Sequence, residues 1–322
     1  MGFGHDFLPN TIYNRDNKAG FVSYLDGKGI QMDFIHSYIT PFTAFSKFEE
    51  YYKTDILDMS KNKIAVVFEM TIKSYAMYST YCSILKEYYN LYGKDFESVR
   101  PSFEELDISA NLENRYIKDL NMLTDLLNKA FPLSGGSLDE FRKLAIMLCY
   151  IGFKKQEIRN IKRSDVNLLS NTISCGKHTI DNIPLRCMSL CEKCLDMTEV
   201  YLNTTAHLPY NKRSFFPLYN NEYLIRIRYE DKRNNNNPVP DVWLGRTIVA
   251  FNKSNDGDYS YDTIRASGLY EWLYNQEKQG IFNPNQPRRS LEKIYEQHFK
   301  AKCSGANLSK NYEIWKQLFY GY

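Results

Sequence analysis

The sequence lacks any long apolar run, and none approaches the roughly 18 residues that a membrane-spanning helix needs. Its first ten residues, MGFGHDFLPN, lack the basic stretch and the apolar core of a secretory signal. Asp6 stands where an N-myristoylation signal needs Ser or Thr. These absences predict a protein without a membrane partner that acts in the cytoplasm.

A disulfide framework and a zinc knuckle are missing as well. The seven cysteines are an odd number without a secretory context, which indicates reduced thiols. Cys191 and Cys194 form a Cys-x-x-Cys pair with His178 and His207 at some distance, but no second such pair completes a tetrahedral zinc site. With Cys187 they follow helical spacing, so we expect three buried thiols, no metal and no cofactor.

Charge is unevenly distributed along the 322 residues. Residues 1–110 carry 11 Lys and Arg against 15 Asp and Glu, whereas residues 111–322 carry 30 against 23, for a net charge of +3. The balances of −4 and +7 suggest that the second part meets a polyanion such as nucleic acid. The alternative is a solvated basic surface without a partner.

The pattern of apolar residues predicts two domains. Residues 1–35 contain five glycines and few periodic apolar positions, which predicts an irregular N-terminal arm. Helical patterns prevail over residues 36–110, most clearly at 71–92, and a linker over 94–114 leads to a second domain at 111–322. Residues 186–205 are expected to be helical, and residues 210–260 are too irregular to assign.

Residues 141–185 are the most informative stretch of the chain. Apolar residues recur there at helical spacing until Gly152, at a position that favours a positive φ. A second, short helix follows, with Ile158 and Ile161 turned inward and a basic outer face. Two β-rich runs, 172–173 and 180–185, then predict a hairpin with Lys177 near its bend.

This order resembles the catalytic core of the tyrosine recombinase, or phage integrase, family. In that family a helix ends in Thr-Gly-x-Arg, a Glu follows three residues later, and a hairpin carries a Lys. The positions in register here are Gly152, Glu157, Ile161, Asp165, Lys177 and the run 183–185. Residues 261–274 resemble the family's His-x-x-Arg box, in which Arg265 matches the second catalytic arginine.

The resemblance implies a mainly α fold with a small β-hairpin or sheet. It also implies two domains, a helical core-binding-like domain at 36–110 and a catalytic-like domain at 111–322. The resemblance over residues 36–93 is looser, and a generic helical bundle is an alternative there.

Two departures decide the expected activity. Lys154 stands where the family has an arginine and lacks its bidentate fork, and Asp262 stands at the family's histidine, where a carboxylate repels a phosphate. No local motif selects the nucleophile among four C-terminal tyrosines: Tyr295, Tyr312, Tyr320 and Tyr322. We therefore expect that no catalytic residue set remains, and that the degenerate positions Lys154, Lys177, Asp262 and Arg265 are relics of it.

The remaining cations point to a DNA clamp. The expected DNA-binding residues are Lys154, Lys155, Arg159, Lys162, Arg163, Lys177, Arg265, Arg288 and Arg289. A DNA-binding protein on a disabled integrase scaffold resembles the lysogeny-maintaining repressors of SPβ-type temperate phages. That resemblance implies a transcriptional repressor that binds operator sites in duplex DNA, in the cytoplasm and at the nucleoid of a bacterial host.

Further partners and two rival functions remain open. A protein or peptide inducer and self-association through the C-terminal tail are compatible with a repressor. One rival is a divergent but active tyrosine recombinase, and the other is a helical interaction protein whose basic cleft binds an acidic partner.

Overall fold

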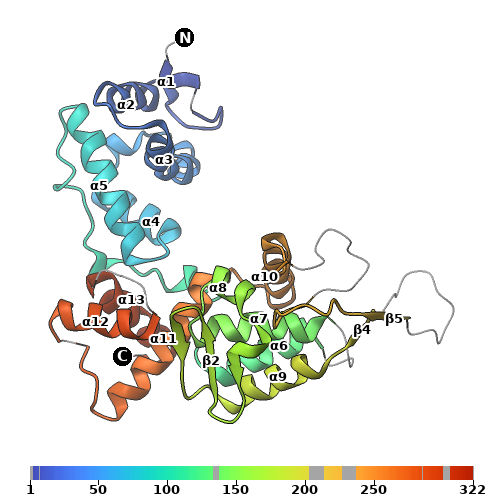
Figure 1. Ribbon diagram of the computed structural model, residues 1–322. Coiled ribbons are helices and arrows are strands. Elements are labelled where there is room, and N and C mark those ends of the chain that lie inside the picture. The colour runs from blue at the N-terminus through green and yellow to red at the C-terminus, as the bar shows by residue number, and fades with distance from the viewer. Residues whose placement is uncertain are drawn as a thin grey trace. The chain divides into compact units, whose positions relative to one another are not determined.

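The protein is mainly α-helical with a small antiparallel sheet, which confirms the fold class expected from the sequence (Figure 1). The computed structural model describes residues 3–6, 8–132, 138–202, 214–226, 237–284, 286–299 and 305–321. The chain divides into two compact units, Met1–Leu112 and Glu113–Tyr322.

Aromatic side chains fill the core of the first unit. Its helices are α1 (Phe3–Asp6), α2 (Arg15–Gly27), α3 (Met32–Tyr52), α4 (Lys61–Thr71) and α5 (Tyr75–Leu91), with short 3-10 turns at Ile56–Asp58, Phe103–Glu105 and Ser109–Asn111. The ring centroids of Phe42 and Tyr88 lie 4.8 Å apart, and those of Phe45 and Tyr81 lie 5.3 Å apart. Both pairs meet edge to face, an arrangement that adds to the stabilisation from burial. The aromatic core therefore joins α3 to α5.

The prediction of an irregular arm over residues 1–35 is wrong. The described residues of this stretch include α2 and the start of α3, and Phe21, Val22 and Leu25 of α2 are buried. These three follow helical spacing. The stretch contains five glycines, which favour irregular structure, and the three-residue pattern was too short to outweigh them. Tertiary packing overrides the weak local preference, as it routinely does.

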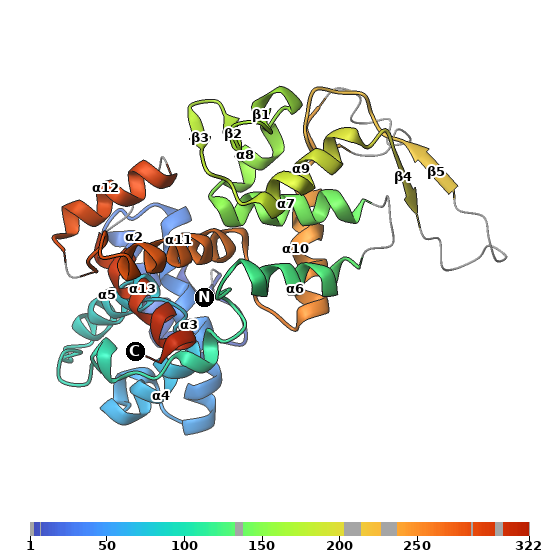
Figure 2. The ribbon, with the colours of Figure 1, turned by 90° about the horizontal axis from the view of Figure 1, so that it is seen from below.

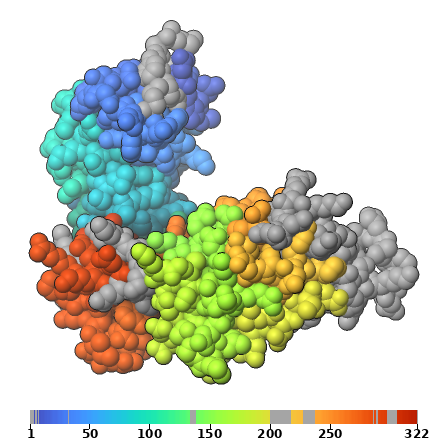
Figure 3. Space-filling model, viewed as in Figure 1, coloured from blue at the N-terminus to red at the C-terminus, as the bar shows by residue number. Residues whose placement is uncertain are grey.

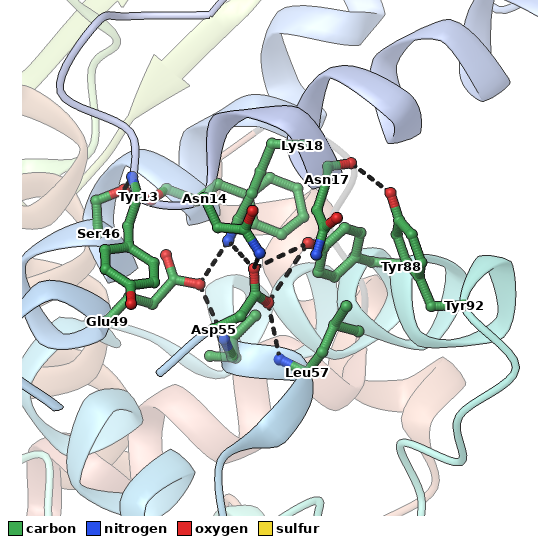
Figure 4. A network of polar contacts seen from close by, with 12 residues as sticks. Tyr13, Asn14, Asn17, Lys18, Ser46, Glu49, Asp55, Leu57, Tyr88 and Tyr92 are labelled. Carbon is green, nitrogen blue, oxygen red and sulfur yellow. Dashed lines mark hydrogen bonds and ion pairs between the residues drawn. The ribbon is translucent and has the colours of Figure 1, made fainter. Parts of the chain in front are cut away.

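A buried network of charged side chains anchors α2 in the first unit (Figure 4). Lys18 is fully buried, and its Nζ lies 2.6 Å from Oε1 of Glu49 and 2.7 Å from Oδ2 of Asp55. Nδ2 of Asn14 donates to the same Asp55 oxygen at 2.8 Å. The Tyr88 hydroxyl also donates to the Asp55 carboxylate. This network holds the segments before, within and after α3 together.

The second unit contains the remaining helices and both sheets (Figure 2). Its helices are α6 (Leu120–Ala130), α7 (Asp139–Ile151), α8 (Lys155–Asn160), α9 (Leu185–Asp196), α10 (Asp241–Asn255), α11 (Tyr261–Lys278), α12 (Arg288–Phe299) and α13 (Gly305–Tyr320), with a 3-10 turn at Arg163–Asp165. One sheet has the order β1 (Val166–Asn167), β2 (Thr172–Cys175) and β3 (His178–Ile180); the other pairs β4 (Glu199–Leu202) with β5 (Ser214–Pro217). In the space-filling view the segments from α7 to α9, drawn in greens, form one packed surface (Figure 3).

Helix α7 is the centre of the second unit, and α11 lies directly against it. Cys149 is fully buried, and its thiol donates to the Tyr261 carbonyl oxygen at 2.9 Å. A Cβ on Gly268 would lie 1.8 Å from the Tyr150 carbonyl oxygen, so only glycine allows this approach. The first half of α11 is thereby fixed beside the end of α7.

Two local expectations in this unit need correction. The helix expected over residues 186–205 ends at Asp196 and is followed by strand β4. The second hairpin strand, expected over 180–185, is His178–Ile180 instead, and Leu185 already begins α9. In the actual register the fully buried Ile173 lies opposite Val166 and Ile180, so the inward residue of β2 sets the pairing.

The C-terminal helix α13 packs on its own unit. Trp315 is fully buried, and its Nε1 donates to the Ile117 carbonyl oxygen at 3.0 Å. Leu308 and Tyr312 are buried on the same helix. Self-association through the C-terminal tail stays a prediction, and these buried side chains are already engaged within the second unit.

Candidate nucleic-acid interface

The end of α7, the start of α8 and the β2–β3 hairpin meet at one carboxylate, that of Glu157. Gly152 ends α7 with a φ of 130°, and Lys154 caps α8 with an extended backbone. Oε2 of Glu157 accepts from the Lys154 backbone N–H at 2.7 Å, so the carboxylate satisfies an otherwise unpaired donor of the helix start. Its Oε1 lies 3.0 Å from Nδ1 of His178, the first residue of β3. One side chain therefore fixes the hairpin on the helix.

The Glu157–His178 contact is protected from solvent on the histidine side. His178 is 3% exposed, and its ring centroid lies 5.0 Å from that of Phe153. Burial of Glu157 opposes its ionisation, but the bonds from His178 and from the Lys154 amide outweigh it and lower the pKa of this carboxyl. A charged Glu157 is thus part of the native structure.

This junction presents two lysines to solvent. Lys154 is exposed at the start of α8, and Lys177 is exposed beside Gly176, whose φ of 61° makes the hairpin bend. Neither ammonium lies within ion-pair distance of a carboxylate among the described residues. Both cations are therefore available to an external anion.

The other predicted cations of this region have partners within the chain. Lys155 Nζ lies 2.7 Å from Oδ2 of Asp241, at the start of α10. Arg159 Nε donates to the Val239 carbonyl oxygen at 2.7 Å. These two residues connect α8 to α10, a role that the sequence did not indicate.

Lys162 and Arg163 likewise bind a neighbouring segment. Lys162 Nζ lies 3.0 Å from Oε2 of Glu222, and the Arg163 backbone N–H donates to the Glu222 carbonyl oxygen at 2.7 Å. The Arg163 guanidinium reaches Oδ1 of Asn220 at 3.5 Å. The Lys162 ion pair is largely exposed, and such pairs contribute little to stability. The four cations predicted to share one basic face therefore make two separate sets of contacts within the chain: Lys155 and Arg159 with residues 239–241, and Lys162 and Arg163 with residues 220–222.

Arg265 contacts Tyr295, one of the four candidate tyrosines. It is half-buried on α11, and one guanidinium nitrogen donates to the Tyr295 hydroxyl oxygen on α12 at 3.2 Å. Asp262, one turn earlier on α11, is exposed. The structure therefore brings together Arg265 and Tyr295, with the Asp262 carboxylate on the same helix as Arg265.

The remaining tyrosines have other environments. Tyr312 is buried and donates to the Glu277 carboxylate, and burial with this bond raises its pKa. Tyr320 stacks on Tyr274 with ring centroids 4.1 Å apart, and burial raises its pKa to about 12. Tyr322 lies outside the described residues.

The last predicted cations lie at the start of α12. Arg289 is exposed in its first turn, whereas the side chain of Arg288 lies outside the described part of the chain. Neither is placed at the Glu157 junction by a described contact.

The three cysteines of α9 are buried, as expected from their helical spacing: Cys187, Cys191 and Cys194. Burial raises the pKa of Cys194, which keeps its sulfur in the thiol form. His207 lies outside the described residues. No group of three or more potential metal ligands gathers among the residues that the structure describes. None of the described helices has the length and hydropathy that crossing a membrane requires.

Comparison with known proteins gives similar structures only. No family model and no curated protein matches the sequence. The crystal structure of XerA recombinase is 13% identical, with 96% of this chain and 95% of that chain covered and a TM-score of 0.41. A lambda integrase (75–356) dimer bound to a COC′ core site is also 13% identical, with 92% and 94% covered and a TM-score of 0.39. The integrase from mycobacterium phage Brujita is 11% identical, with 93% and 91% covered and a TM-score of 0.33.

Proposed function

We propose that the protein binds duplex DNA sequence-specifically through the surface around the Glu157 junction. The observation that carries this proposal is the pair of exposed lysines, Lys154 and Lys177, held beside a buried Glu157–His178 contact. Two exposed lysines without ion-pair partners among the described residues can contact phosphates without first breaking an internal ion pair. The basic balance of residues 111–322 favours binding of a polyanion by this part of the chain.

We further propose that the protein is a transcriptional repressor of a temperate phage, acting at operator sites without cutting DNA. Lys154 offers a single point charge where the recombinase family has a bidentate guanidinium. The exposed Asp262 carboxylate lies one helical turn before Arg265 and would repel a phosphate bound there. Both features favour a binder of the kind represented by the SPβ-type phage repressor YopR.

A second candidate function is an active tyrosine recombinase with Tyr295 as the nucleophile. The observation that favours it is the 3.2 Å contact between Arg265 and the Tyr295 hydroxyl. In such a reaction the tyrosine oxygen bonds to the phosphorus while a deoxyribose hydroxyl leaves, and a guanidinium stabilises the charge that develops.

Quantitative footprinting on the encoding genome tests the binding proposal. We expect several dispersed short sites, and an affinity whose log–log salt slope falls by about 1 in Lys154→Ala and in Lys177→Ala, because each removes one phosphate contact. Lys129→Ala, which changes an exposed lysine at the end of α6, should leave the slope unchanged. A flat salt response of the parent protein contradicts the proposal.

A nicked suicide substrate separates the two candidate functions. A repressor should form no covalent adduct with it, and Tyr295→Phe should bind operator DNA as the parent does. An adduct that disappears in Tyr295→Phe but persists in Tyr320→Phe would identify an enzyme.

A further inference from the structure

Residues of helices α6, α7 and α9 line a solvent-open pocket of about 420 Å³ in the second unit. Its floor is apolar and includes the buried Leu127 and Met147 together with Leu190. This volume lies within the range of roughly 300–1,000 Å³ that is typical of small-molecule sites. None of its lining residues belongs to the proposed DNA-binding surface, so the pocket is a separate site.

A buried lysine without a counter-ion lines this pocket. Lys143 is 5% exposed, and its Nζ donates to Oδ1 of Asn128 at 3.2 Å. No carboxylate of the described residues lies within ion-pair distance of it. Glu140, one turn earlier, pairs with Lys193 at 2.7 Å, so that carboxylate is already compensated. An ammonium group that is largely removed from water is less stable without an anion beside it.

Most of the charged side chains that line the pocket have the same sign as this lysine. Arg186 also lines it, and its guanidinium bonds to two neutral oxygens, those of Asn121 and Thr124. With Lys143 and Lys193 there are three cations against the one carboxylate of Glu140. Burial lowers the pKa of Lys143, which indicates that its charged form is under-stabilised.

We propose that this pocket binds a small amphipathic anion, an aliphatic carboxylate whose head group contacts Lys143. The hydrocarbon chain lies along Leu127, Met147 and Leu190, and the carboxylate supplies the counter-ion that the described residues do not. A neutral or cationic ligand of the same shape leaves the ammonium uncompensated and therefore binds less well.

Calorimetric titration of the full chain with sodium octanoate tests this site. Octanoate should bind saturably, and octanamide, of the same length but neutral, should bind at least about tenfold more weakly, which corresponds to about 1.4 kcal/mol. Lys143→Met should weaken octanoate by a similar factor and abolish the preference over octanamide. The matched control, Lys129→Met, changes an exposed lysine of α6 and should bind octanoate as the parent does.

A second variant separates loss of the site from loss of the fold. Ser189 is exposed on α9 and lines the pocket, so Ser189→Trp should fill the cavity without removing a charge. It should abolish octanoate binding while the thermal unfolding midpoint stays within a few degrees of the parent. The proposal is overturned by saturation only at tens of millimolar octanoate, by equal affinity for octanamide, or by undiminished binding to either pocket variant.

Discussion

Removal of the Lys18 ammonium should destabilise the first unit more than any surface change on it. Lys18 is fully buried between two carboxylates, and Lys18→Met replaces it with an apolar side chain of similar length. The variant keeps the volume of the side chain but leaves Glu49 and Asp55 without their cation. One oxygen of Glu49, Oε2, is already buried without a hydrogen-bond partner in the described structure.

The expected cost follows from the geometry of the network. Two unit charges separated by the 2.6 Å of the Lys18–Glu49 contact attract by about 6 kcal/mol at an effective dielectric constant of about 20. Desolvation of the buried ions offsets much of this attraction in the intact network, whereas removal of one partner typically costs about 3–5 kcal/mol. We therefore expect a loss of about 3–5 kcal/mol at neutral pH.

The loss should depend on pH in a defined direction. Burial raises the pKa of Glu49 above its ordinary value of 4.5, and the Lys18 ammonium opposes that rise. A carboxyl whose pKa is raised on folding contributes stability below its unfolded pKa and loses it as the pH rises through the folded pKa. Without Lys18 this pKa rises further, so the variant should lose less stability near pH 4.5 than near pH 7.

The distribution of tryptophan makes the assay specific to one unit. All three tryptophans, Trp243, Trp272 and Trp315, lie in the second unit, so their fluorescence reports that unit alone. Urea unfolding followed by far-UV circular dichroism should show an early transition in Lys18→Met, while the fluorescence transition stays in place. Lys47→Met, an exposed change on α3, should shift neither by more than about 0.5 kcal/mol.

One double variant separates charge from packing. Lys18→Met combined with Glu49→Gln removes one of the two uncompensated carboxylates and should recover part of the lost stability at neutral pH. A Lys18→Met protein as stable as the parent at pH 7 would refute the reasoning.

Three further predictions concern the second unit. Gly268→Ala should lower the free energy of unfolding by at least about 1–3 kcal/mol, because its Cβ would meet the Tyr150 carbonyl oxygen. Gly245→Ala, in open space on α10, should raise it by about 0.5–1 kcal/mol, and thermal unfolding compares the two variants. Glu157→Gln should loosen the β2–β3 hairpin, seen as faster amide exchange at His178. The parent should show the same loosening in acid, because the lowered pKa of Glu157 contributes stability that is lost as the pH falls through that pKa. Equal protection of the His178 amide at pH 3 and pH 7 contradicts this. Elemental analysis should find far less than one zinc per chain, and a chelator should leave the unfolding midpoint unchanged, whereas stoichiometric zinc would overturn the buried-thiol interpretation of α9.

The order of elements around residues 141–185 could be predicted because local patterns specify it. Periodic apolar residues define α7 and α8, and Ile158 and Ile161 are fully buried as expected. Gly152 has the positive φ that its place at a helix end indicated. Strand boundaries were predicted less well, because Ile173, buried between two partner strands, sets a register that the sequence of one strand does not contain.

What the sequence by itself determined is thus the fold class, the helix–glycine–helix–hairpin order and the burial of Ile158 in α8 and of the three cysteines in α9. Only the tertiary structure decided what each exposed group faces: Lys155 meets Asp241, which lies 86 residues further along the chain, and Arg265 meets Tyr295. It also decided that α2 belongs to the core of the first unit. The buried Lys18 of α2 pairs with Glu49 and Asp55, which lie far from α2 in the sequence. The physical reason is that residue spacing fixes the direction of a side chain relative to its own helix or strand. The groups that share a buried network or a pocket are determined by how distant segments pack.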